Sequence, residues 1–253
     1  MTLREQLARI FIVHKCSSCG HILDAEHFDD ALCEDCYSAY KSAKIVGCPN
    51  CFMAAFECTC QPRMMSGEGS LCLRKLFFYR AGREDLPQNR LVYFFKHKRS
   101  HRVTSFLASE LWSSLEDELC EAGVTDVASS VLSVSIPRGR RAQIRDGFDQ
   151  SELFCYELER ISGIRYLPVL RRRLGGKEQK KLTAAQRKRN IKDLIYADDR
   201  LAAAVRGKYV VLFDDVVTTG ASMSICLAKL RKMGARGVFC CCVAYDLKNK
   251  TTR

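Results

Sequence analysis

Residues 209–222 hold the side chains best suited to chemistry, in the order Tyr-Val-Val-Leu-Phe-Asp-Asp-Val-Val-Thr-Thr-Gly-Ala-Ser. The apolar half predicts a buried strand that runs into two carboxylates, Asp214 and Asp215, and Gly220 precedes a predicted helix and lets the backbone approach a ligand closely. Three hydroxyl groups follow the strand: Thr218, Thr219 and Ser222. With the N–H groups of a helix start they form a cradle for phosphate, and the carboxylates would accept hydrogen bonds from neighbouring sugar hydroxyls. The segment therefore predicts a ribose phosphate site.

A strand followed by two aspartates is also typical of the Walker B segment of ATPases. That interpretation requires a partner segment Gly-x-x-x-x-Gly-Lys-[Ser/Thr], which neither Gly176-Lys177 nor Gly207-Lys208 supplies. An ordinary capped helix explains the segment less well, because two acids and four small or hydroxyl residues exceed what capping requires.

Eight of the 15 cysteines form four close pairs within residues 16–60: Cys16/Cys19, Cys33/Cys36, Cys48/Cys51 and Cys58/Cys60. A segment this short cannot bury enough apolar surface to fold unaided, and two Cys-x-x-Cys turns can close a tetrahedral zinc site. We expect two structural zinc ions, one held by the first two pairs and one by the last two. A crossed pairing stays open, as does replacement of one thiolate by His14, His21 or His27, because the last pair is Cys-x-Cys.

The other seven cysteines predict no chemistry. Cys240, Cys241 and Cys242 lie in an apolar run typical of a buried strand, where alternate side chains point to opposite faces and cannot converge on one ion. The remaining four are isolated: Cys72, Cys120, Cys155 and Cys226.

Strands and helices that alternate along residues 63–253 must position the ribose phosphate site. Apolar periodicity predicts helices at 102–121, 151–161 and 221–233, and strands at 131–136, 164–170, 209–213 and 238–244. This order indicates an α/β domain with a mainly parallel sheet flanked by helices, preceded by a zinc-binding head at residues 1–62. Ligands of such sheets bind at the carboxyl ends of the strands.

Positive charge dominates the sequence, with 41 lysines and arginines against 29 acidic residues and a net charge of +12. Residues 138–192 contain sixteen basic and six acidic residues, so most of the excess is local. Such a surplus favours polyanionic partners, although a solvated basic face is the commonest outcome of a charge run.

No apolar run reaches membrane length, and the first twelve residues lack the apolar core of a secretory signal. We expect a cytoplasmic protein without a membrane span.

The chain resembles the ComF/GntX family, in which a zinc-ribbon head precedes a type I phosphoribosyltransferase domain. Residues 214–222 resemble the phosphoribosyl diphosphate (PRPP) motif, and residues 141–150 resemble the family's Arg-Gly-Phe-Asn-Gln segment; Gln179-x-x-Leu182 followed by Arg187-x-x-Asn190 extends the match. Asp149 stands where the family has asparagine, and Ser222 where it has threonine.

The resemblance implies a role for each segment. Asp214 and Asp215 would be the catalytic carboxylates that hold the ribose hydroxyls, within a PRPP site made of Asp214, Asp215, Val216, Val217, Thr218, Thr219, Gly220, Ala221 and Ser222. The loop facing diphosphate would be Ser135, Ile136, Pro137 and Arg138. Magnesium would accompany PRPP. A mobile basic loop would carry Arg171, Arg172, Arg173, Lys177, Lys180 and Lys181, and the same loop offers a track for single-stranded DNA.

Two functions follow from this resemblance. The first is a ComF-like protein that binds PRPP, magnesium and single-stranded DNA and takes part in DNA uptake with a competence helicase or recombination proteins. The second is an active phosphoribosyltransferase with an unknown small-molecule acceptor. The region expected to choose a base, residues 71–98, shows no base-recognition signature. Its aromatic residues, such as Phe77, Phe78 and Tyr93, could stack on bases, but aromatic residues with this spacing more often belong to the core.

Overall fold

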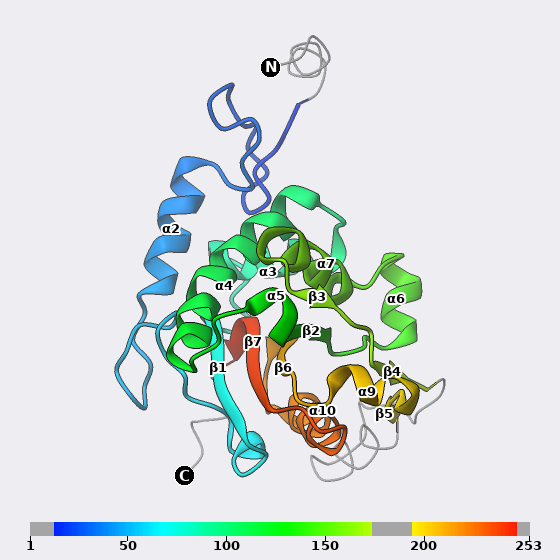
Figure 1. The fold of residues 1–253 in the computed structure, drawn as a ribbon. Coiled ribbons are helices and arrows are strands. Elements are labelled where there is room, and N and C mark those ends of the chain that lie inside the picture. Colours follow the sequence, from blue (N-terminus) through cyan, green and yellow to red (C-terminus); the bar gives the residue numbers. More distant parts are fainter. Residues whose placement is uncertain (1–12, 174–193, 247–253) are drawn as a thin grey trace.

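The computed structural model describes residues 13–173 and 194–246 (Figure 1). The chain begins with two small cysteine-bearing hairpins, closed by isolated bridges between Lys15 and Ile22 and between Gly47 and Ala54. Helix α2 (Glu34–Lys44) lies between them, and the short helix η1 (Arg63–Met65) follows the second.

A five-stranded parallel sheet forms the body, in the order β1-β7-β6-β2-β3. The strands are β1 (Ser70–Tyr79), β2 (Val131–Ser135), β3 (Arg165–Tyr166), β6 (Tyr209–Val217) and β7 (Gly237–Asp246). A separate antiparallel hairpin is formed by β4 (Leu170–Arg172) and β5 (Ile195–Ala197). The mainly parallel sheet confirms the expected α/β class.

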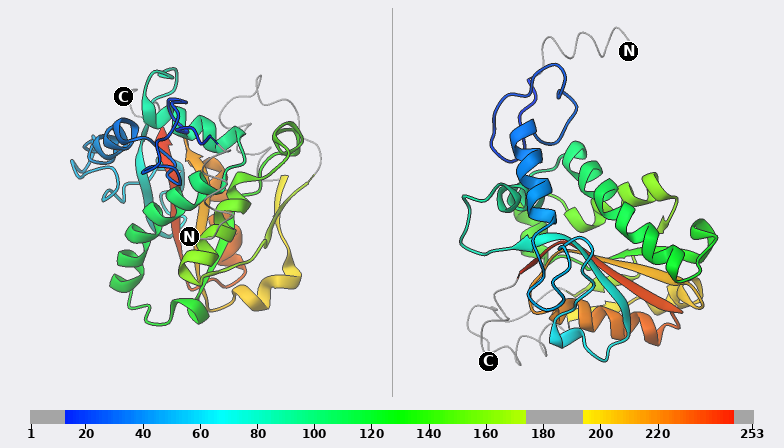
Figure 2. Two further views of the ribbon diagram at one scale, coloured as in Figure 1. Left: turned by 90° about the horizontal axis from the view of Figure 1, so that it is seen from above. Right: turned by 90° about the vertical axis from the view of Figure 1, so that its left-hand side faces the viewer.

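Helices cover both faces of the sheet (Figure 2). One face carries α3 (Pro87–His97), α4 (His101–Glu121) and α7 (Gln150–Ser162), and the other carries α10 (Ala221–Lys232). The shorter elements are α5 (Val127–Ser130), α6 (Arg140–Asp146), η3 (Asp199–Leu201) and α9 (Ala202–Val205). No helix in the described part of the chain is long and apolar enough to span a bilayer.

The predicted strand at 164–170 was wrong in its extent. The structure ends β3 at Tyr166 and starts β4 only at Leu170, in the separate hairpin. Pro168 lies between them, and proline has no N–H group to continue a ladder. Residues 71–98 begin with β1, an edge strand of the main sheet, and its Phe77 and Phe78 are buried, which confirms the expectation that these aromatic residues belong to the core.

The cysteine-bearing hairpins pack against the body instead of standing apart. Cys16 and Cys36 belong to the hydrophobic core on the α4 face, whereas Cys48 and Cys58 belong to the core on the α10 face. Glu110 of α4 accepts hydrogen bonds from the Tyr40 hydroxyl at 3.0 Å and from the Lys44 ammonium at 2.6 Å. These contacts fix α2 to the body.

Candidate functional site

The chain reverses its direction across the sheet between β2 and β6. From β2 it continues to β3 on one side, and it later returns to β6 on the other side. In parallel sheets the crevice at such a switch point, beyond the carboxyl ends of the strands, is where ligands bind. Strand β2 stops at Ser135, opposite Phe213, so the last residues of β6 have no strand partner on that side.

Asp214 and Asp215 lie in this last part of β6, which pairs with β7 but not with β2. The strand runs on to Val217 because β7 continues to pair with it, so the carboxylates belong to the strand and not to the turn after it. Adjacent strand residues point to opposite faces. Asp215 accordingly meets α3 and α7, while Asp214 lies near Cys226 of α10, where its charge helps to raise the pKa of that thiol.

The two carboxylates differ in their surroundings. Asp215 accepts a hydrogen bond from Gln150 Nε2, and its Oδ1 lies 3.5 Å from the Lys96 ammonium. Burial, reinforced by the charge of Asp215, raises the pKa of Asp214 well above its ordinary value. A bound diol or cation would relieve the repulsion between the two carboxylates.

The turn after β6 has the geometry of a helix start. Gly220 caps α10 with φ of 77°, a left-handed conformation that favours glycine. A Cβ atom at this position would lie 2.9 Å from Met65 Cγ and 3.0 Å from Pro62 Cγ. Glycine is therefore needed for the close packing of this turn on the segment around η1, and its approach to a ligand stays a prediction.

A cavity of about 380 Å³ lies beside the β2 end and is strongly basic. Its arginines come from the β2–α6 region and from the β4 hairpin: Arg138, Arg140, Arg171, Arg172 and Arg173. Two acidic residues, Asp149 and Glu152, also line it. Ser135, which lines the cavity, pairs with Phe213 of β6, so the cavity adjoins the end of β6 that carries the two carboxylates. Five guanidinium groups suit a ligand with several phosphate oxygens.

Arg138 is already engaged in this cavity. Its guanidinium lies 2.7 Å from Asp146 and donates to the Lys96 carbonyl at 3.3 Å, and its backbone N–H donates to Asp149 Oδ2 at 3.2 Å. The Ser135 hydroxyl likewise shares a 2.8 Å hydrogen bond with Tyr166. These two residues of the predicted diphosphate loop shape the cavity wall, which leaves the remaining arginines with more freedom to meet a ligand.

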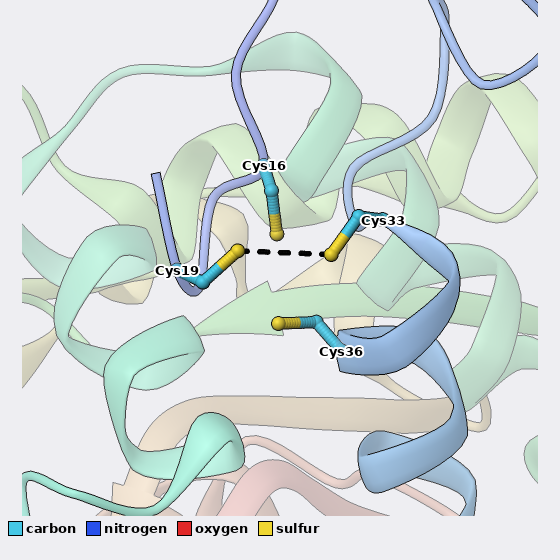
Figure 3. Close-up of side chains that lie close together, drawn as sticks. All are labelled: Cys16, Cys19, Cys33 and Cys36. Carbon is cyan, nitrogen blue, oxygen red and sulfur yellow. Dashed lines mark hydrogen bonds between the residues drawn. The ribbon is translucent and has the colours of Figure 1, made fainter. Parts of the chain in front are cut away.

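The eight paired cysteines form two clusters that could each hold a metal ion. Cys16, Cys19, Cys33 and Cys36 make one, and Cys48, Cys51, Cys58 and Cys60 make the other, with the sulfur atoms of each set within 4.8 Å of one another. Figure 3 shows the four sulfur atoms of the first cluster pointing toward a common centre, with Cys19 and Cys33 3.6 Å apart. The grouping agrees with the uncrossed pairing expected from the sequence.

Both clusters carry the N–H donors that stabilise thiolates. Burial alone raises the pKa of Cys16, but the backbone N–H groups of Cys19, Cys33 and Ser18 bring it down to about 7. Cys48 behaves in the same way, and N–H groups at Cys51 and Asn50 bring its pKa to about 6. Such thiolates fit a tetrahedral zinc ion.

Two of the three histidines considered as alternative ligands have other partners. His14 shares a 2.7 Å hydrogen bond with the Phe28 carbonyl, and His27 lies 2.8 Å from Asp30. Among the described residues, neither cluster includes a histidine.

Lys75 of β1 connects the second cluster to the sheet. Its side chain is 0% exposed, and its ammonium donates to the carbonyls of Cys58 at 2.7 Å, Cys60 at 3.0 Å and Leu73 at 3.0 Å. A buried ammonium with three carbonyl partners is a strong constraint on the loop that carries two of the four thiols.

With this geometry established, similarity to known proteins defines the family. The DNA utilization protein YhgH of Escherichia coli K12 is 31% identical over 162 residues, which is 64% of this chain and 68% of that protein; its Salmonella typhi counterpart is 32% identical over the same shares. The competence protein ComFC of Streptococcus pneumoniae R6 is 24% identical over 237 residues, covering 88% of this chain and 96% of that protein. The chain belongs to the ComF-like family. No family model matches it.

Solved structures similar to this ComF-like chain include two proteins of purine metabolism. One is described as the allosteric regulatory enzyme of purine biosynthesis, with a TM-score of 0.37 and 21% identity over 61% of this chain and 30% of that one. The other is a purine phosphoribosyltransferase from Pyrococcus horikoshii, with a TM-score of 0.34 and 17% identity over 55% of this chain and 74% of that one.

Some of the predicted site residues lie together in the ComF-like chain, and others lie outside the described residues. The predicted diphosphate loop shares one cavity with Arg171, Arg172 and Arg173, and the β6 carboxylates lie next to it. Three members of the predicted basic loop lie outside the described residues: Lys177, Lys180 and Lys181.

Sequence reasoning missed two residues that contact Asp215, namely Lys96 and Gln150. Lys96 follows an aromatic run, and Gln150 ends the segment that resembles the family, so only the second carried a signal.

Proposed function

We propose that this ComF-like protein binds PRPP with magnesium at the carboxyl end of β6. The observation that carries the proposal is the position of a carboxylate pair and a helix-start turn next to an arginine-lined cavity, all at the switch point of the sheet. A ribose 5-phosphate with a diphosphate at C1′ presents matching groups: hydroxyls, one phosphate and a second, more highly charged phosphate group.

In the proposed complex the ribose hydroxyls donate to Asp214 and Asp215, and the turn from Thr218 to Ser222 binds the 5′-phosphate through N–H groups and hydroxyls. The arginines of the cavity face the diphosphate. Magnesium, when bound with PRPP, supplies positive charge that offsets the diphosphate. Lys96 and Gln150 keep Asp215 in place before the ribose arrives.

The same basic surface is proposed to bind single-stranded DNA in a role in DNA uptake. Support comes from the names of its relatives, a DNA utilization protein and a competence protein, and from the surplus of ten positive charges in residues 138–192. Phosphate contacts of this kind bind any sequence and weaken steeply with salt. A competence helicase or recombination protein is the proposed partner.

The cysteine clusters are proposed to hold two structural zinc ions in a head at residues 1–62, ahead of a phosphoribosyltransferase-like domain at residues 63–253. The N–H donors at Cys16 and Cys48, and the fact that the described cysteines are free of disulfide bonds, support metal-bound thiolates. Free thiols also favour the cytoplasm as the proposed setting.

An active phosphoribosyltransferase with an unknown acceptor is the second candidate. The cavity and carboxylates would serve either function, because loss of diphosphate from C1′ needs positioning and charge stabilisation more than a protein nucleophile. Release of diphosphate from PRPP in the presence of candidate acceptors would distinguish turnover from binding.

Calorimetry with zinc-loaded protein tests the proposal directly. PRPP should bind only with magnesium, and Asp215→Asn should weaken binding about tenfold or more, since the amide donates where the ribose needs an acceptor. Asp199→Asn, an exposed substitution on η3, is the matched control and should bind normally. Folded protein that gives no magnesium-dependent heat with PRPP would reject the site.

A further inference from the structure

A second basic cavity lies at the opposite edge of the sheet, where the parallel strands begin. It has a volume of about 380 Å³ and is enclosed by the turns that precede β2, β6 and β7. Three of its lining residues are cationic: Arg206, Lys208 and Arg236. Among the described residues that line it, none is acidic. This cavity therefore differs from the one at the carboxyl edge, which contains two carboxylates.

The cations of this amino-edge cavity are held in place without ion pairs to described carboxylates. The Arg236 guanidinium lies 5.0 Å from the centre of the Tyr209 ring, and the Lys208 ammonium donates to the Ser129 carbonyl. Arg206 packs against Gly234, where a Cβ would lie 3.2 Å from Arg206 Cγ. Within the described part of the chain none of the three takes part in an ion pair, so their charges stay available to a ligand.

Two helix C-termini meet at this edge of the sheet, and basic residues are common at helix C-termini. Helices α4 and α10 end beside the cavity, and each C-terminus carries about half a negative charge. Their last carbonyls are tied up, since Val124 N–H donates to the Leu119 carbonyl at 2.9 Å and Ala235 N–H to the Leu230 carbonyl at 3.1 Å. Two half charges offset only about one of the three cations.

A nearby carboxylate, Asp126, offsets only part of the remaining charge. The charge of Lys208 helps to lower the pKa of Asp126, but the largest contributions to that shift are the hydrogen bonds that Asp126 accepts from Ser129. Both carboxylate oxygens of Asp126 accept hydrogen bonds from Ser129, one from its N–H at 3.1 Å and the other from its hydroxyl. The cavity thus keeps a positive charge and an aromatic side chain, Tyr209, in its wall.

We infer that this amino-edge cavity is a second anion site that binds a phosphate group through Arg206, Lys208 and Arg236. The phosphate belongs either to the backbone of a single-stranded polynucleotide or to a small phosphorylated metabolite, and Tyr209 offers a flat surface beside it for a sugar or base. The inference does not depend on PRPP binding, because none of these residues lies at the carboxyl edge.

Full-length protein with all three cations replaced tests the inference: Arg206→Gln, Lys208→Gln and Arg236→Gln. The control removes the same charge from exposed positions away from this edge, by Lys41→Gln, Arg80→Gln and Arg90→Gln. Near-ultraviolet circular dichroism and thermal midpoints show that each variant is folded. The probes are a twenty-residue oligo-dT, followed by fluorescence anisotropy over a salt series, and inorganic phosphate and thymidine 5′-monophosphate, followed by phosphorus NMR line broadening.

Two outcomes support the anion site and distinguish its ligand. If the site variant loses about tenfold in oligo-dT affinity and its salt slope falls by about two while the control is unchanged, the phosphate is that of the polynucleotide. If instead the broadening of the small phosphates falls and oligo-dT binding does not, the ligand is a metabolite. Site and control variants that behave alike with every probe would overturn the inference, since only net charge would then matter.

Discussion

Replacing Lys75 by methionine should weaken the second cysteine cluster selectively. Methionine keeps the length and apolar stem of lysine but removes an ammonium that donates three hydrogen bonds in a fully buried position. Two of the acceptors are the carbonyls of Cys58 and Cys60, in the loop that carries half of the cluster. The substitution also removes a positive charge beside four thiolates, whose complex with zinc has a net negative charge.

The size of the effect follows from the three lost partners. At about 1 kcal/mol for each hydrogen bond, the free energy of unfolding should fall by about 3 kcal/mol. For a chain of this size that corresponds to a fall of roughly 6 to 12 °C in the thermal midpoint. Removal of a buried charge, which is costly to desolvate, would reduce this loss.

Zinc release into a chromophoric chelator, followed over time, is the decisive assay. In the variant one of two zinc ions should leave faster than in the unsubstituted protein, and the other should leave at its original rate. Lys232→Met on the exposed face of α10 is the control and should change neither rate nor thermal midpoint. Equal acceleration of both ions, or no change in rate and stability, would refute the role assigned to Lys75.

Four further substitutions test three separate features by thermal or chemical unfolding. Asp214→Asn should stabilise the free protein by about 1 kcal/mol at pH 7, because folding raises the pKa of Asp214. The protonated carboxyl contributes stability that is fully present below its unfolded pKa of about 3.9 and is lost as the pH rises through the folded pKa. The gain in stability from asparagine should therefore shrink toward acid pH. Gly20→Ala should lower the free energy of unfolding by about 1 kcal/mol through its φ of 78° alone. Phe52→Gly, at the equivalent position with φ of 63°, should leave stability unchanged or raise it by up to about 1 kcal/mol. A loss of stability on Phe52→Gly would show that the ring contributes to the fold. Gly220→Ala should cost about 2 kcal/mol or more because it adds contacts with Met65 and Pro62 to the same backbone strain, and a cost equal to that of Gly20→Ala would mean that η1 yields freely.

The contrast between Gly20 and Phe52 arises from two hairpins built alike. Gly20 N–H donates to the Cys16 carbonyl and Phe52 N–H to the Cys48 carbonyl, both at 2.9 Å. Among the described residues Phe52 alone is a non-glycine with positive φ, and its side chain is 83% exposed. The cysteine spacing predicted both clusters, but spacing does not report backbone strain.

Local patterns predicted the elements of the sheet well, and they failed where a neighbouring strand decided the outcome. The helix predicted at 102–121 was found as α4, and the structure adds its cap, Ser100, which accepts a hydrogen bond from Val103 N–H. The strand predicted to end at Phe213 instead continues to Val217, because β7 supplies hydrogen-bond partners that charge and hydropathy do not reveal. Asp214 and Asp215 were therefore expected after the strand but lie within it, and their role as ligand-binding carboxylates stays a prediction.

The partners of the candidate site were harder to predict because they come from distant segments. Lys96 and Gln150 reach Asp215 from α3 and α7, on the face opposite α10. Nothing in a single sequence links residues separated in this way, since their contact depends on how two helices pack on one sheet. The arginines of the cavity were predicted in part, because a charge run stands out in composition.

Asp149 shows how the fold accommodates a charge that the family resemblance does not lead one to expect. One carboxylate oxygen caps α7 by accepting from the N–H groups of Ser151 at 3.0 Å and Glu152 at 3.4 Å, and the other accepts from Arg138 N–H at 3.2 Å and Gln143 Nε2 at 3.0 Å. The positive end of the α7 dipole further offsets its charge. Its two oxygens thus accept hydrogen bonds from the protein, and the five arginines that line the same cavity outnumber its two acidic residues, so an aspartate at this position is compatible with a diphosphate site.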